Sequence, residues 1–146
     1  MSIVLDTALL NNNANPVLKL VQGDTEPTLI VNLYNELNDS ETGSIVDTVI
    51  DVSTSVVRLK IRLANTTDIV DTVVGHPIPG LLQADGSIIF TAPYNIAGTG
   101  GRVAFFWNEN SLSKAGSVEG EIEITFPDGR VQTVYRVIKM RVRGQF

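Results

Sequence analysis

Two glutamates, Glu121 and Glu123, have the clearest spacing for catalysis in this sequence. Alternate residues of a strand point to the same face, so both carboxylates would share one side of the strand expected here. Two carboxyl groups about 5–9.5 Å apart can hydrolyse a glycosidic bond. The exposed side of an ordinary strand shows the same pattern, and Arg58, Lys60 and Arg62 alternate likewise and could pair across strands. We therefore expect ion pairs here, with a hydrolase using the two glutamates as the lesser alternative.

A second basic segment bears on this expectation, because Lys139, Arg141 and Arg143 also alternate. If the two basic strands were neighbours, six cations would repel one another on one face. An acidic strand between them would relieve that repulsion, and so would an acidic partner. We expect intramolecular pairing with Glu121 and Glu123, and a partner subunit's acidic surface is the second choice.

Neither a catalytic triad nor a zinc site is predicted. His76 is the only histidine, the chain has no cysteine, and no G-x-S-x-G nucleophile motif is present. The glycine-rich residues 98–101 lead into a strand-like segment at Arg102, whereas a phosphate loop leads into a helix. We expect a loop histidine without a role and a flexible turn, and no catalytic residue or cofactor.

Two pairs of loop acids could offer oxygen ligands to calcium. They are Asp24 with Glu26 and Asp39 with Glu41. Neither pair has the ligand spacing of an EF-hand loop. We interpret them as solvated loop acids and predict no metal site.

Three consecutive aromatic residues, Phe105, Phe106 and Trp107, form the most apolar local feature. On a strand, Phe105 and Trp107 share one face and Phe106 takes the other. At least one of these faces should pack in a core. An aromatic on an exposed face would be an interface anchor or a platform for stacking sugars, so Phe106 and Trp107 are candidate interface residues.

Alternating apolar residues separated by turn residues predict an all-β protein, a sandwich or barrel. Pro127-Asp128-Gly129 is typical of a hairpin tip, and Ala84-Asp85-Gly86 of a turn. Residues 35–43, 75–80, 93–101 and 108–116 are expected as loops. Strands are expected at residues 17–21, 28–34, 45–50, 57–63, 69–74, 87–91, 102–107, 120–126, 131–135 and 138–143.

Residues 1–16 are interpreted as a leader that precedes the domain at 17–146. Its asparagine-rich half has loop chemistry, which favours a frayed terminus. It also carries an apolar cluster that a disordered tail usually lacks, which favours an arm docking on a neighbour. The candidate interface residues of this arm are Ile3, Val4, Leu5, Leu9 and Leu10.

Length and charge limit the class of protein. A chain of 146 residues is long enough for one domain without disulfides. The net charge of −5 argues against general nucleic-acid binding. No signal peptide or run of about 20 apolar residues is present, so we expect synthesis in the cytoplasm and no membrane partner. Residues 1–73 hold ten acids and four bases, and residues 74–146 hold six acids and seven bases.

Several segments resemble one family. They are residues 19–25 (KLVQGDT), 52–61 (VSTSVVRLKI), 84–87 (ADGS), 114–116 (KAG) and 121–133 (EIEITFPDGRVQT). Together they resemble the immunoglobulin-like N-terminal domain of phage baseplate upper proteins, over roughly residues 17–143. Ser55 stands where that pattern has a small glycine, and a baseplate upper protein would continue into a stalk beyond this domain.

The resemblance implies a single immunoglobulin-like antiparallel β-sandwich with a short N-terminal arm. It also implies a non-enzymatic virion structural protein, an assembly or adaptor module of a tail, baseplate or head fibre. Its partners would be other virion proteins, in a homo-oligomer or as symmetric copies in a particle, after synthesis in the host cytoplasm. The alternative is a glycan-binding β-sandwich module, based on the three aromatics and the loop acids.

Overall fold

The computed structural model describes residues 2–6, 17–38, 45–134 and 137–146. These described residues form β-strands and connecting loops and contain no helix. The prediction of an all-β protein is confirmed. The strands are β1 (Ser2–Asp6), β2 (Leu18–Val21), β3 (Thr28–Asn32), β4 (Tyr34–Asn38), β5 (Ile45–Val49), β6 (Val56–Leu63), β7 (Ile69–Val74), β8 (His76–Pro77), β9 (Leu81–Leu82), β10 (Ile88–Ile89), β11 (Arg102–Phe105), β12 (Gly116–Thr125), β13 (Val131–Thr133) and β14 (Ile138–Arg143).

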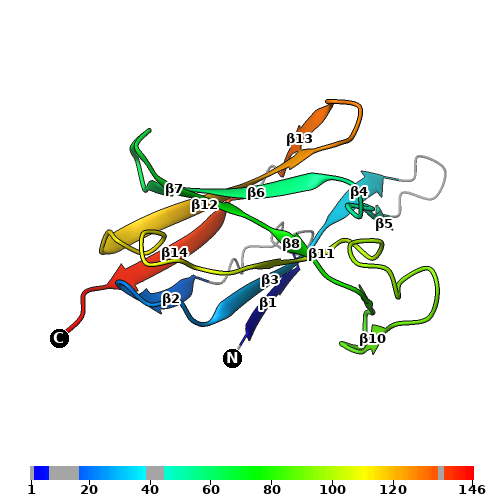
Figure 1. The fold of residues 1–146 in the computed structure, drawn as a ribbon, viewed down its shortest axis with the longest axis horizontal. Helices are drawn as coiled ribbons and strands as arrows, with labels where there is room; N and C mark the ends of the chain where they lie inside the picture. Colours follow the sequence, from blue (N-terminus) through cyan, green and yellow to red (C-terminus); the bar gives the residue numbers. More distant parts are fainter. Residues whose placement is uncertain (1, 7–16, 39–44, 135–136) are drawn as a thin grey trace.

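Two larger sheets form the layers of a sandwich (Figure 1). Sheet A has the order β1-β3-β11-β8, and sheet B has the order β2-β14-β12-β6-β7, with β13 paired to β12. The hairpins β4–β5 and β9–β10 stand beside them. Pairing is antiparallel except at two sheet edges, where β1 runs parallel to β3 and β2 runs parallel to β14. The predicted antiparallel sandwich is therefore confirmed, with parallel strands added at these edges.

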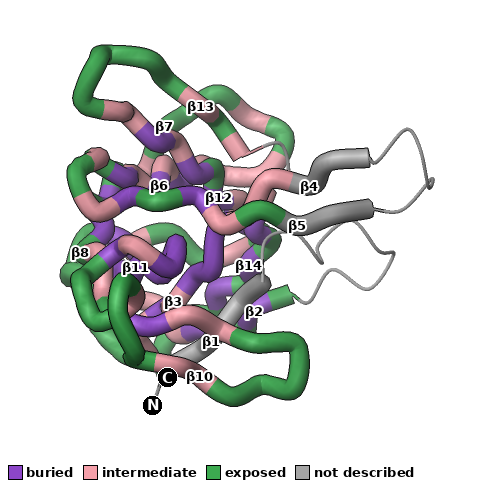
Figure 2. Tube along the Cα trace, turned by 90° about the vertical axis from the view of Figure 1, so that its right-hand side faces the viewer, coloured by how far each residue is buried: buried purple, intermediate pink, exposed green. Residues whose placement is uncertain are grey.

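The core lies between the two sheets, where buried segments of both face one another (Figure 2). Residues of β14 alternate strictly between buried and exposed. Leu59 and Ile122 from sheet B, and Leu29 and Phe105 from sheet A, are fully or almost fully buried. Apolar side chains at every second position thus supply the burial that stabilises the fold.

The predicted hairpin tip at Pro127-Asp128-Gly129 is confirmed between β12 and β13. The Phe126 N–H donates to the carbonyl of Arg130 at 2.8 Å, and the Gly129 N–H donates to the carbonyl of Phe126 at 2.9 Å. Gly129 has a φ of +88°, which glycine adopts without strain. The backbone N–H of Arg130, and then its guanidinium, stabilise the Asp128 carboxylate and lower its pKa below 3.8.

Some predicted boundaries are wrong. Residues 35–38 are not loop, because they continue β4 and pair with β5. Gly116 is not loop either, since β12 begins there opposite Val142 and not at residue 120. Residues 76–77 of the predicted loop form β8 on the edge of sheet A, next to β11. In each case pairing with another strand overrides a polar or glycine-rich local sequence.

Candidate functional site

The outer face of sheet B brings the predicted charged residues together. Strand β12 lies between the basic strands β6 and β14. Glu121 stands opposite Lys60, and Glu123 stands opposite Arg58. The acidic strand therefore separates the two basic strands, which is the arrangement expected to relieve their repulsion.

Ion pairs engage two of the three glutamates on this face. Lys60 Nζ lies 2.7 Å from Glu123 Oε2, and Arg62 Nη2 lies 3.7 Å from Glu119 Oε1. Pairing of Glu123 with a base of β6 is confirmed, whereas Glu119 is a partner that the sequence analysis did not name. Both pairs are partly exposed, so each contributes little to stability.

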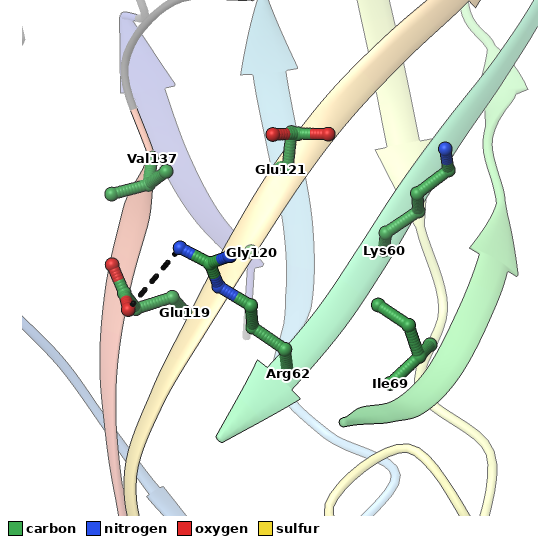
Figure 3. A pocket seen from close by; sticks show the side chains of 7 residues that line it. All are labelled: Lys60, Arg62, Ile69, Glu119, Gly120, Glu121 and Val137. Carbon is green, nitrogen blue, oxygen red and sulfur yellow. Dashed lines mark ion pairs between the residues drawn. The ribbon is translucent and has the colours of Figure 1, made fainter. Parts of the chain in front are cut away.

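A small pocket lies on this face. Its volume is about 60 Å³, which is room for a few waters and far below the ~300–1,000 Å³ of small-molecule sites. Glu121 lines it and Glu123 does not, so the pocket does not hold both carboxylates of the supposed catalytic pair. The lining residues, drawn in Figure 3, are Lys60, Arg62, Ile69, Glu119, Gly120, Glu121 and Val137.

The Lys60–Glu123 pair makes one pH-dependent prediction. The hydrogen bond and charge of Glu123 raise the pKa of Lys60 above 10.5. The pair's contribution to stability is therefore fully present below pH 10.5 and is lost as the pH rises through the higher folded pKa. Glu123→Gln should move the Lys60 pKa back towards 10.5, as measured by NMR titration of the lysine ε-carbon.

Glu121→Gln is the matched control for this titration. The Glu121 carboxylate acts on Lys60 through its charge, without a hydrogen bond, and it raises the Lys60 pKa less than Glu123 does. It should therefore lower the Lys60 pKa less than Glu123→Gln does. Equal shifts in the two variants would show that the 2.7 Å contact is not what holds the ammonium group.

The aromatic triplet divides between core and surface as its alternation predicts. Phe105 is fully buried, Trp107 is 4% exposed and Phe106 is 51% exposed. The Trp107 Nε1–H donates to the carbonyl of Pro27 at 2.7 Å. The assignment of Trp107 as an interface residue is thus wrong, because its ring packs inside its own sandwich. Phe106 is the one member that faces outward.

His76 lies beside Phe106. Their ring centroids are 5.2 Å apart, with 54° between the ring planes. His76 is exposed on the short edge strand β8.

Among the described residues, no group of three or more histidines, aspartates and glutamates is placed to hold a metal ion. Of the proposed calcium pairs, Asp39 and Glu41 lie outside the described residues.

The leader enters the fold through β1. Ile3, Val4 and Leu5 lie in this strand, in register with Leu29, Ile30 and Val31 of β3. The other two candidate arm residues, Leu9 and Leu10, lie outside the described residues. Part of the apolar cluster that favoured a docking arm therefore lies in a strand at the edge of sheet A.

Arg102 is a buried charge that the sequence analysis did not single out. It is 5% exposed, and burial lowers the pKa of its guanidinium. Its Nε donates to Asn32 Oδ1 at 3.2 Å, and its Nη1 donates to the carbonyl of Pro79 at 3.3 Å. Alternation with the exposed Phe106 would have placed Arg102 outside. Its burial depends on the approach of Asn32 and Pro79 from other parts of the chain.

No protein-family model matches the chain, and a search of curated proteins finds no match. The resemblance to baseplate upper proteins therefore stays a prediction. Within the described ranges there is no helix with the length and apolar character to span a membrane.

Proposed function

We propose that this chain is a non-enzymatic structural protein of a phage particle, an assembly or adaptor module of a tail, baseplate or head fibre. The particle is suggested by the resemblance of residues 17–143 to baseplate upper proteins, and the observation that carries the assembly role is β1. The five residues of β1 pair with β3 at the edge of sheet A, and residues 7–17 separate them from β2, which belongs to sheet B. An N-terminal strand at a sheet edge is a natural element for joining copies or partners.

Backbone hydrogen bonds make such a strand transferable. They do not depend on side-chain identity, so a strand from another subunit can occupy the same edge. The eleven connecting residues can reach at most about 36–40 Å, enough for an arm to contact an adjoining subunit. Exchange of one element between identical subunits is a common route to oligomers. Pairing of the acidic strand with its basic neighbours further supports a structural role over a carboxylate active site.

Deletion of residues 1–16 tests this proposal. The full chain is expected to form an oligomer in solution, and the deleted chain is expected to have the mass of a monomer, as measured by light scattering after gel filtration. Deletion of 144–146, which belong to no strand, is the matched control and should leave the oligomer intact. An unchanged mass after removal of 1–16 would contradict the arm.

The virion role has its own test. The genes beside this one should encode tail or capsid proteins if the chain is part of a particle. Neighbouring genes that encode only metabolic enzymes would contradict the virion role. The exchange of β1 between subunits would then still be tested by the light-scattering mass measurement.

One observation favours the glycan-binding alternative. The exposed Phe106 ring beside His76 is an aromatic surface on which a sugar ring could stack. A glycan array with and without calcium tests it, with Phe106→Ala as the variant expected to lose signal. A uniformly blank array would count against this function.

A further inference from the structure

The outer face of sheet B holds most of the positive charge of an acidic protein. Seven of the chain's eleven lysines and arginines lie there, against three glutamates. This face is therefore net positive, although the chain carries −5. The seven bases are Lys19, Arg58, Lys60, Arg62, Lys139, Arg141 and Arg143.

The excess charge is concentrated on the β2–β14 side of the face. On the other side, β6 places Lys60 and Arg62 against glutamates of β12. None of the ion pairs found in the described part of the chain involves Lys19, Lys139 or Arg141. The Nη1 of Arg141 donates to Ser117 Oγ at 3.0 Å, which orients the guanidinium without neutralising it.

A groove of about 310 Å³ runs past these cations. Lys139 and Arg141 line it together with Ser117 and the apolar side chains of Val17 and Ala64. Glu119 also lines it, and its carboxylate pairs at 3.7 Å with Arg62, whose side chain reaches across β12 (Figure 3). The groove thus combines apolar walls with Lys139 and Arg141, for which the described residues show no ion pair, although Glu119 stands opposite Lys139 in the strand register.

The spacing of the cations indicates what fits them. Lys139, Arg141 and Arg143 occupy every second residue of β14, so their Cα atoms repeat at about 6.6–6.8 Å. An extended peptide with an acid at every second residue has the same repeat. The apolar walls at Val17 and Ala64 suit a peptide, whose neutral side chains can contact them, better than a sugar-phosphate backbone.

We propose that this cationic groove binds an extended acidic segment of a partner polypeptide. Arg141 holds one carboxylate through the N–H groups that Ser117 does not occupy, and Lys139 and Lys19 attract its neighbours as mobile point charges. This inference goes beyond the proposed function and does not depend on it, because β1 lies on the other sheet.

Binding is measured by fluorescence anisotropy, with the full chain and a labelled peptide of about eight residues that alternates aspartate and threonine. The double variant Lys139→Glu/Arg141→Glu should bind at least about tenfold more weakly than the natural chain. The double variant Lys114→Glu/Arg130→Glu is the matched control, because it makes the same charge change at exposed sites that do not line the groove. Its affinity should change less than about threefold, since charges that do not touch the peptide are screened by solvent and salt.

Other outcomes of this experiment would overturn the proposal. Equal weakening in both double variants would show that net charge alone governs binding. Equal affinity for a peptide with asparagine in place of aspartate would exclude carboxylate recognition. Tighter binding of a single-stranded oligonucleotide with the same number of charges would assign the groove to nucleic acid. Affinity for the acidic peptide should fall between about 50 and 500 mM salt, and it should survive deletion of 1–16.

Discussion

Phe105→Ala is expected to lower the free energy of unfolding by about 3–5 kcal/mol. Phe105 is the largest of the fully buried side chains and lies at the end of β11, in the central part of sheet A. Its ring packs against Gly75, where an added Cβ would lie 2.9 Å from Cε1. Removal of the ring loses its burial and leaves a cavity that the surrounding strands cannot fill. The loss is a large share of the ~5–15 kcal/mol that stabilises a typical domain.

Phe106→Ala is the matched control, because it is the same change one residue later on the exposed face. It should alter stability by less than about 0.5 kcal/mol. Urea unfolding, followed by tryptophan fluorescence of Trp107, measures both variants. If Phe105→Ala does not fold, Phe105→Leu gives a smaller loss that can be measured. Equal losses at the two positions would contradict the assignment of faces in β11.

This pair of neighbours also shows what the sequence could predict. Alternation depends on the fixed geometry of a strand, so it assigned Phe105 to one face and Phe106 to the other without knowledge of the fold. The same geometry predicted the charged face of β12 and the apolar face of β6. Turn chemistry was equally local, and it located the tip at 127–129.

Features formed by contacts between distant segments could not be predicted in this way. Arg102 is buried because Pro79 and Asn32 approach it from elsewhere in the chain. Strand β8 lies in a proline-containing loop sequence and exists as a partner of β11, more than twenty residues later. The loop between β10 and β11 has the composition of a flexible turn, yet its glycines lie where three segments meet.

The candidate site could be predicted only in part, because some of its features depend on contacts between segments that are distant in the sequence. The sequence indicated that an acidic strand would lie near basic ones, because charge alternation is local and repulsion is general. It indicated the bases of β6 as partners, and Lys60 does pair with Glu123, but it missed Glu119 as the partner of Arg62. The groove beside Lys139 and Arg141 depends on β14, β12 and the turn at Ala64 meeting, so no local pattern encodes it.

The second large effect is expected at Gly100, where substitution by alanine should destabilise the protein by about 3 kcal/mol. A Cβ at this position would fall on the backbone carbonyl of Gly80, and it would also lie 3.1 Å from Leu81 Cα. A side chain can rotate away from such a clash, but backbone atoms move only if the segment moves. Backbone hydrogen bonds of Gly98 hold the loop that carries Gly100 in place. The Gly98 N–H donates to the carbonyl of Ile78, and the Gly98 carbonyl accepts from the N–H of Val52.

Gly144→Ala is the matched control, since its added Cβ would have only Gln22 Oε1 within 4 Å, at 3.7 Å. It should change stability by less than about 0.5 kcal/mol. Gly86→Ala separates backbone strain from crowding, because Gly86 has a φ of +88° and open space around its Cβ position. It should cost about 1–2 kcal/mol from the left-handed conformation alone. A Gly100→Ala protein as stable as Gly144→Ala in urea unfolding would mean that the loop is flexible and that Gly100 was not selected for close packing.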